Sequence, residues 1–199
     1  MKKKITILLL LVIFGYPVLA QNSDNEFKIS LQTDLLAYTT KNGYSAWGVA
    51  KYGQNKLALA YINYPNRSND VAGVQENMRF LRLQLSRHFN PCSKLRNFYY
   101  GINIEHHWRE LEEDNNPDEI LNDTRWEGGL FIGYEWQPWK KKDNALKNIS
   151  IIPWLGANYV FDDGGQARVF ENTGTVYNNT STIRQTLGIN ISYTIFRRN

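Results

Sequence analysis

Beyond its first twenty residues, the sequence lacks an apolar run long enough for a membrane-spanning helix, which needs about 20 residues. The longest apolar stretch lies near Ile149 to Ala157, and Ser150 and Pro153 interrupt it. If the chain crosses a membrane, it must do so as a closed barrel, because only helices and closed barrels satisfy every backbone polar group in lipid.

The sequence also has little cysteine and, apart from its N-terminal segment, almost no net charge. Cys92 is the single cysteine, which excludes an intramolecular disulfide. Lys and Arg number 23 against 19 Asp and Glu, but Lys2, Lys3 and Lys4 belong to the N-terminal segment and leave 20 basic residues. Nucleic-acid binding requires a strong basic excess on one face, so we expect no nucleic-acid partner.

The N-terminal segment has the features of a cleaved signal peptide. Three lysines precede an apolar stretch from Ile5 to Ala20, and Val18-Leu19-Ala20 ends it with the small residues that a signal peptidase requires. We expect residues 1–20 to be removed before Gln21 and residues 21–199 to form one domain. An uncleaved anchor helix is the alternative. The residue directly after the cleavage site is Gln21 and not a cysteine, so we do not expect a lipoprotein.

Aromatic residues are abundant, and alternation of apolar and polar residues is the main pattern. In the last segment, Ile183, Leu187, Ile189, Ile191, Tyr193 and Ile195 alternate with Arg184, Thr186, Gly188, Asn190, Ser192 and Thr194. Similar segments are 27–38, 44–52, 56–64, 78–89, 98–109, 124–137 and 148–161. Successive strand side chains point to opposite faces, so the pattern predicts eight strands. We expect an all-β, eight-stranded antiparallel up-and-down transmembrane β-barrel.

The connections and the aromatic residues fit that barrel. With a periplasmic N-terminus, the segments Pro65–Gln75, Glu110–Asp123 and Asp162–Ser181 become external loops, and Pro138–Lys147 becomes a long inner connection. On one strand, Trp126 lies near the outer end, and Tyr134 and Trp136 lie near the inner end. Two aromatic girdles at the membrane interfaces are typical of outer-membrane barrels.

The chain resembles the small OmpA/OmpX-like outer-membrane barrels over its whole mature length. The most specific element is the final strand, with Thr186-x-Gly188-x-x-Ile191-x-Tyr193. It looks like the signal that barrel-assembly machinery reads, although Arg197-Arg198-Asn199 replaces the usual aromatic end. The aromatic-rich strands are also similar to uncharacterised small barrels of Bacteroidetes-type bacteria. The resemblance implies a Gram-negative cell envelope, an outer-membrane location and the assembly machinery as a partner.

An eight-stranded barrel has an interior just wide enough for side chains to fill. The inward positions predict a polar lumen network of Asp34, Arg82, Glu105, His107, Arg109, Arg125, Glu127, Glu135 and Arg184, with Lys28 nearby. Buried charges must pair or be solvated, so we interpret these residues as a plug of salt bridges. A regular hairpin would place His107 opposite Glu127 and Arg109 opposite Arg125. A conducting or catalytic lumen is the alternative, but a wide porin channel is excluded by strand number and a TonB-dependent transporter by length.

Three other groups have a structural and a functional interpretation. His106 and His107 are adjacent in a strand and face opposite sides, so they cannot share a metal; we expect no metal or cofactor. An acidic segment is either solvated or binds divalent cations between lipopolysaccharide phosphates; it contains Glu110, Glu112, Glu113, Asp114, Asp118, Glu119 and Asp123. A basic inner rim either contacts phospholipid or binds a periplasmic partner; it contains Lys94, Arg96, Lys140, Lys141, Lys142, Lys147, Arg197 and Arg198.

These features together predict a structural or interaction barrel without catalytic activity and with external binding loops, which acts alone or as a subunit of a larger envelope complex. The first alternative is a lipid A-modifying enzyme that uses His106 on the lipid side, although no His-x-Ser pair accompanies it. The second is a soluble periplasmic lipocalin-like binder, which would need apolar residues inside the barrel and polar residues outside.

Overall fold

The computed structural model describes residues 26–68, 73–89, 94–114, 116–162, 168–177 and 183–198. The predicted signal peptide and its cleavage site lie outside these residues. Among the described residues, no helix combines the length and the hydropathy of a membrane span. Two short 3-10 helices are present, η1 (Leu35–Thr39) and η2 (Ala145–Asn148).

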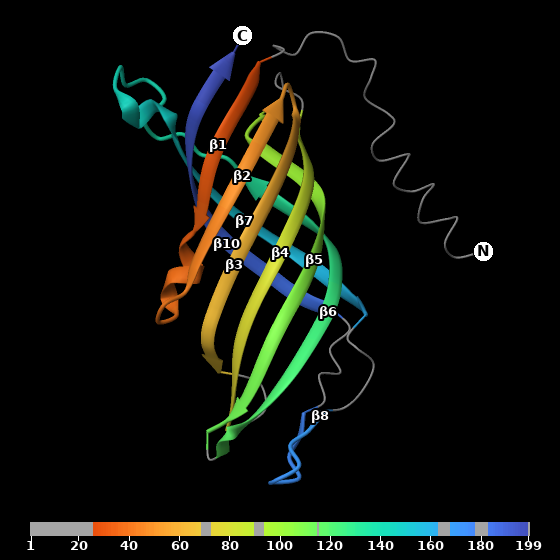
Figure 1. Cartoon of the computed structure of the whole chain (residues 1–199). Helices are drawn as coiled ribbons and strands as arrows, with labels where there is room; N and C mark the ends of the chain where they lie inside the picture. Colours follow the sequence, from red (N-terminus) through yellow and green to blue (C-terminus); the bar gives the residue numbers. More distant parts are fainter. Residues whose placement is uncertain are drawn as a thin grey trace, which may run out of the picture.

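Eight long strands form a closed antiparallel barrel (Figure 1). They are β1 (Phe27–Asp34), β2 (Tyr44–Tyr52), β3 (Asn55–Ser68), β4 (Val74–His88), β5 (Phe98–Glu113), β6 (Asn116–Tyr134), β7 (Ile149–Asp162) and β10 (Ile183–Arg198). Each strand pairs with its neighbours in sequence, and β1 closes the ring on β10. The structure confirms the predicted all-β, eight-stranded up-and-down barrel. A small separate sheet joins β8 (Arg168–Val169) to β9 (Val176–Tyr177).

Alternation along the strands places polar residues inside the barrel and apolar residues outside it. On β4, Leu81, Leu83 and Leu85 are exposed on the outer surface, whereas Arg82 and Gln84 are buried in the lumen. The same arrangement recurs on β10, where exposed Leu187, Ile189 and Ile191 alternate with buried Asn190 and Ser192. The barrel is therefore inverted relative to a water-soluble protein, whose apolar side chains are mostly inside.

The barrel wall is much taller on one side than on the other. The strands β3 to β6 extend far beyond β1 and β2, at the end opposite to the C-terminus (Figure 1). The segment 110–123, predicted as an external loop, instead lies largely in β5 and β6, whose strands end at Glu113 and begin at Asn116. The many charged residues favoured a loop, but the alternation of a strand continues through this segment. Leu111 is fully buried on the inner face, whereas Glu112 lies on the outer face.

Strand β1 ends earlier than the alternation predicts. The expected strand 27–38 stops at Asp34, whose carboxylate accepts a hydrogen bond from Leu36 N at 3.0 Å and caps η1. An Asp at this position favours a helical turn because its side chain satisfies a backbone N–H that has no partner in the turn. Consequently, η1 folds beside the outer part of β10 instead of continuing the ladder.

Candidate functional site in the barrel lumen

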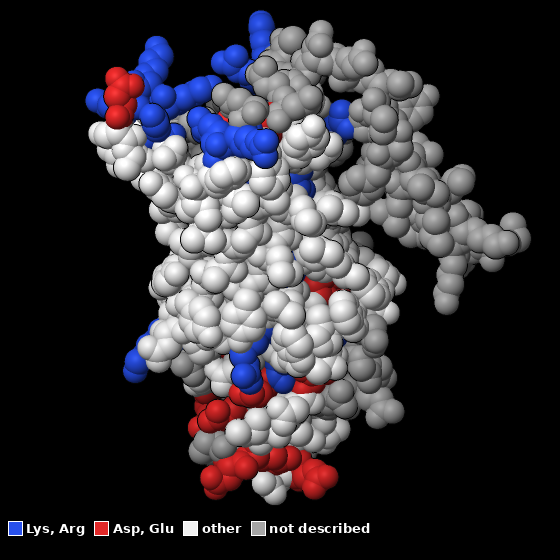
Figure 2. Space-filling view, turned by 45° about the horizontal axis from the view of Figure 1, so that its top comes forward, with Lys and Arg blue, Asp and Glu red and all other residues white. Residues whose placement is uncertain are grey.

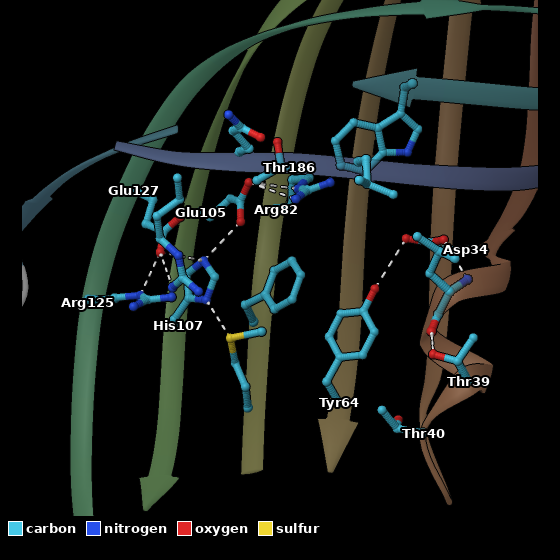
Figure 3. Close-up of a pocket in the computed structure, with 17 residues that line it drawn as sticks. Asp34, Thr39, Thr40, Tyr64, Arg82, Glu105, His107, Arg125, Glu127 and Thr186 are labelled. Atoms are coloured by element: carbon cyan, nitrogen blue, oxygen red, sulfur yellow. Dashed lines mark hydrogen bonds and ion pairs between the residues drawn. The ribbon is translucent and has the colours of Figure 1, made fainter. Parts of the chain in front are cut away.

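The centre of the lumen holds a cluster of buried charged side chains from four strands (Figure 3). Glu105 on β5 contacts Arg82 on β4 and His107 on β5, each at 2.9 Å. Glu127 on β6 contacts Arg125 at 2.6 Å and Arg184 on β10 at 3.4 Å. The two glutamates are 1% and 2% exposed, so each negative charge is held away from bulk water by a direct cationic partner.

The strand register explains why this cluster contains three arginines. Glu105 lies directly opposite Glu127, and His107 lies opposite Arg125. The predicted register, with His107 opposite Glu127, is therefore wrong by two residues because the hairpin turns earlier and has an irregularity at Glu112/Glu113. Like charges directly opposite each other destabilise a strand pair, so the two carboxylates require cations from the neighbouring strands.

Two asparagines complete the cluster and were not among the predicted site residues. Asn158 Nδ2 donates to Glu105 at 2.6 Å and lies 3.4 Å from Glu127, and Asn103 Nδ2 also donates to Glu105. A Cβ at Gly129 would collide with the Asn158 side chain, so the glycine provides the space that Asn158 occupies. Alternation between exposed Ala157 and Tyr159 was the signal that could have identified Asn158.

The other three predicted residues lie in separate groups along the barrel axis. Asp34 is near the end of β1, where its second oxygen lies 3.4 Å from the Tyr64 hydroxyl. Arg109 is closer to the outer end and pairs with Asp123, which faces it, and with Glu76 at 3.5 Å. The structure thus brings together six of the predicted residues: Arg82, Glu105, His107, Arg125, Glu127 and Arg184.

Glu135 forms the third group, at the inner mouth of the barrel just after the last residue of β6. Its carboxylate lies 3.3 Å from His88 Nε2 and 3.8 Å from Lys51 Nζ. Burial raises the pKa of Glu135, but the hydrogen bond from His88 and the charges of Lys51 and Lys56 outweigh burial. The net effect holds the pKa of this carboxyl well below its usual range.

Aromatic side chains also fill the lumen, which the sequence interpretation missed because it assigned tryptophan to the membrane interfaces. Trp47, Phe80 and Trp154 point inward and are at most 7% exposed. The Arg82 guanidinium carbon lies 4.7 Å from the Trp154 ring centroid, 5.4 Å from Phe80 and 5.6 Å from Trp47. Cation–π contacts of this kind stabilise a desolvated guanidinium and fix Arg82 next to Glu105.

The cluster has two chemical capabilities to consider, metal binding and acid–base catalysis. Ligand atoms of Glu105, His107 and Glu127 lie within 4.8 Å of one another, a spacing that suits a cation. However, Arg82, Arg125 and Arg184 already neutralise both carboxylates, so the electrostatics oppose a divalent ion. The two His107 nitrogens lie 3.3 Å from the Met78 sulfur and 2.9 Å from Glu105, rather than beside a hydroxyl nucleophile.

His106 lies on the opposite face of β5, as the alternation predicts. Its ring packs between Trp108, at 4.5 Å between centroids, and Trp126, at 4.4 Å. This is an aromatic cluster on the outer surface of the barrel, where both tryptophans are more than one-third exposed. The packing gives His106 a structural role in that cluster.

A cavity of about 430 Å³ adjoins the central cluster in the outer half of the lumen. Its walls include the charged cluster, the aromatic residues Phe80 and Trp154, and three residues of the η1 region, Leu36, Thr39 and Thr40. Gln185, Thr186 and Leu187 of β10 line the other side. The lumen is therefore filled at its centre by side chains and hollow toward its outer part.

The two ends of the barrel carry opposite charges (Figure 2). Lysines and arginines gather at the end that bears the C-terminus, where Lys140, Lys141, Lys142, Arg197 and Arg198 are exposed. Acidic residues gather at the opposite end, on the β5–β6 hairpin. Between the two ends, the visible surface is largely without charge (Figure 2).

The fold and the lumen together define a small inverted β-barrel with an ion-paired interior. No protein-family description and no curated protein matches the chain. Among solved structures, it is similar to Neisserial surface protein A, with 12% identity over 88% of this chain and all of that chain, at a TM-score of 0.49. It is also similar to the N-terminal β-barrel domain of Pseudomonas aeruginosa OprF, with 13% identity over 87% and 100% of the two chains, at 0.40. A major outer membrane protein from Thermus thermophilus has 14% identity over 87% and 99%, at 0.40.

Proposed function

We propose that this chain is a small outer-membrane barrel that acts through its surfaces and has no catalytic activity. The observation that carries the proposal is the inverted polarity of the barrel. Leu130, Leu155 and Leu187 are 63–65% exposed on the outer surface, while Glu105 and Glu127 are at most 2% exposed inside. An apolar surface that encircles the molecule is stable in lipid and would aggregate in water. It also argues against the lipocalin-like alternative.

The exposed aromatic residues support a membrane orientation. Trp136, Tyr193 and Tyr52 lie toward the end that carries the C-terminus, whereas Trp126 and Tyr159 lie toward the other. On β6, eight residues separate Trp126 from Tyr134, which corresponds to about 20 Å of height at a typical strand tilt. The apolar belt between two aromatic girdles therefore has the dimensions of the hydrocarbon layer of an outer membrane.

In this orientation, the lumen is a plug and the two ends are the functional surfaces. The central ion pairs and the aromatic residues around Arg82 fill the cross-section of an eight-stranded barrel, which leaves no wide aqueous channel. The basic end faces the periplasm and contacts anionic phospholipid or a periplasmic partner. The acidic β5–β6 hairpin projects outward as a binding surface for envelope components, consistent with a subunit of a larger complex.

The first test is fractionation of cells, followed by electrophoresis of boiled and unboiled mature protein. We expect recovery in the outer membrane and a heat-dependent change in migration, because folded barrels resist detergent. Leu130→Arg places a charge in the apolar belt and should destabilise the folded form by about 2–4 kcal/mol. The matched control, Ile120→Arg, alters a residue that is also exposed but lies on the projecting hairpin, and should have little effect. Equal effects of the two variants, or a soluble periplasmic protein, would contradict the proposal.

The plug is tested by electrical recording from the folded protein in a planar lipid bilayer. We expect no sustained conductance in concentrated potassium chloride, because the central cluster occupies the cross-section. Stable, stepwise currents from the unmodified protein would contradict a plugged lumen and favour a conducting one.

A further inference from the structure

The barrel seam between β1 and β10 is incomplete toward the outer end. β1 pairs with β10 from Phe27↔Arg198 to Asp34↔Asn190, but β10 begins at Ile183. Along residues 183–189, β10 pairs with β7 on one side, and no strand of the described chain pairs with its other edge. The helix η1 lies beside this edge because the chain turns at Asp34.

The incomplete seam lies at the height of the apolar belt. Ile183 is 67% exposed and pairs with Tyr159 of the outer aromatic girdle, and Leu187 lies closer to the centre of the belt. Unpaired backbone groups are costly in lipid, so an open strand edge is tolerated only where other parts of the protein bury it or where it lines a cavity. At this seam, η1 lies beside the edge of β10, and residues of the same part of β10 line the cavity of the lumen.

The cavity described above reaches this seam. Its lining combines inward-facing Glu127 and Arg184 with Gln185 and Leu187, which face outward from the same end of β10. Residues of both faces of β10 therefore border the cavity at the edge that has no strand partner among the described residues. Thr39 and Thr40 of the η1 region line the same cavity (Figure 3).

The charges along the opening favour a ligand with an anionic group at its outer end. Arg184 lies near the outer girdle and, at one-fifth side-chain exposure, is more accessible than Arg82 or Arg125. Around Glu105 and Glu127, three guanidinium groups face two carboxylates. Asp34 lies farther from the outer end than Arg184, because it is opposite Asn190 in the strand register, six residues after Arg184 on β10. Its carboxylate oxygens contact Leu36 N and the Tyr64 hydroxyl. An anion would therefore be attracted to the Arg184 end of the opening.

We propose that the seam between η1 and β10 is a lateral binding site for a single-chain amphiphile of the outer leaflet. Its phosphate or carboxylate binds Arg184 inside the lumen, and its acyl chain stays in the membrane against Leu187. The volume of about 430 Å³ lies in the range of small-molecule sites, and the lining combines apolar walls with a few charged groups, as such sites do. This inference rests on the proposed membrane location of the barrel.

The test measures lipid retention by native mass spectrometry of the mature barrel in neutral detergent micelles. The probes are a single-chain phosphatidylglycerol, which is anionic, and a single-chain phosphatidylcholine, which is zwitterionic. We expect the anionic probe to bind at least about fivefold more tightly. Arg184→Gln should weaken its binding by about tenfold or more, since hydrogen bonds to charged groups are among the stronger ones.

A second pair of variants tests the route of entry. Leu187→Trp should block the opening and abolish retention. Leu155→Trp is the matched control, because Leu155 lies directly opposite Leu187 on β7 and is 63% exposed but does not line the cavity. Equal retention by the two variants, or equal binding of the two probes, would overturn the lateral site. Heat-dependent migration of each sample verifies that the barrel is folded. If a folded barrel retains no lipid, the lateral binding site is refuted, whereas the proposed outer-membrane barrel is not.

Discussion

At the scale of residues, the lumen is stabilised by buried ion pairs that are highly sensitive to the loss of one partner. Glu105 is in contact with Arg82, His107 and Asn158, and it is only 1% exposed to solvent. The attraction within such a pair largely offsets the cost of burying it, but removal of one partner leaves an uncompensated charge. The charged cluster therefore adds little net stability as a whole, whereas the loss of a single partner is costly.

Arg82→Gln should destabilise the folded barrel by about 3–5 kcal/mol, because Glu105 would remain buried without its arginine. The free energy of unfolding is measured by urea titration in lipid vesicles with the electrophoretic shift as readout. Arg79→Gln, on the same strand, is the control: Arg79 pairs with Glu110 at the surface, and its loss should cost at most about 1 kcal/mol. Similar costs for the two variants would show that the lumen is hydrated.

Glu135→Gln should reduce stability at neutral pH by about 1–3 kcal/mol, because the variant loses the hydrogen bond between its carboxylate and His88 and the ion pair with Lys51. The pKa of Glu135 is lowered in the folded state, so its stabilisation is present above the ordinary value of 4.5 and decreases as the pH falls below it. Urea titrations at several pH values should show the difference between the two proteins shrinking in acid. A difference that is constant from pH 7 to pH 3 would contradict this assignment.

The inward orientation of these residues was predictable from the sequence, but their contacts were not. Alternation placed Glu105, Arg125 and Glu127 on the inner face, because the side-chain period of a strand is two residues. Which residues face each other depends on where the hairpin turns, and the early turn of β5–β6 moved the register by two residues. Asn158 on β7 also belongs to the cluster. Its contact with Glu105 and Glu127 could not be predicted, because it depends on how far β7 is shifted along the barrel relative to β5 and β6.

At the scale of elements, the β5–β6 hairpin shows how a charged segment remains ordered beyond the barrel. Leu111 is fully buried and packs with Val74 on β4 and with Phe170 from the segment after β7. Because the inward residues of the hairpin have this small apolar core, the acidic residues on its surface do not unfold it. This small core could not be predicted from the charged segment alone, because Phe170 lies about 60 residues further along the chain.

Leu111→Ala should loosen the projecting hairpin while the barrel itself stays intact. Removal of a fully buried leucine costs about 2–5 kcal/mol, here confined to the local core. A Glu-specific protease should then cleave the hairpin much faster, with unchanged heat-dependent migration of the barrel. Ile120→Ala is the control, since Ile120 is 53% exposed on the same hairpin. Equal cleavage of the two variants would show that the hairpin has no core of its own.

At the scale of the whole molecule, the charges are separated along the barrel axis, with basic residues at one end and acidic residues at the other (Figure 2). Basic side chains near anionic headgroups are attracted to them, and acidic side chains are repelled. The distribution favours one orientation in a membrane, with the start of β1, the end of β10 and the basic side chains on the side of anionic phospholipid.

Exchange of Lys140 and Lys141 for Gln should weaken the interaction of the basic end with anionic lipid by about 1 kcal/mol for each charge. Folding of the variant into vesicles that contain phosphatidylglycerol should therefore be slower than that of the unmodified protein, and high salt should remove the difference. The control carries Glu112→Gln and Asp118→Asn at the opposite end and should fold at the unmodified rate. An equal rate for all three proteins would exclude a role of the basic end in membrane contact.

The seam between β1 and β10 also determines the order in which the molecule can be assembled. Ser30 and Thr194 are hydrogen-bonded across the seam but are separated by 164 residues in the chain, whereas the other neighbouring strands are joined in sequence. Loop-closure entropy disfavours contacts between distant parts of a chain, so hairpins form early and the seam closes last. Until that step, the protein is an open sheet with two free edges, and the same junction is the first to separate when the barrel unfolds.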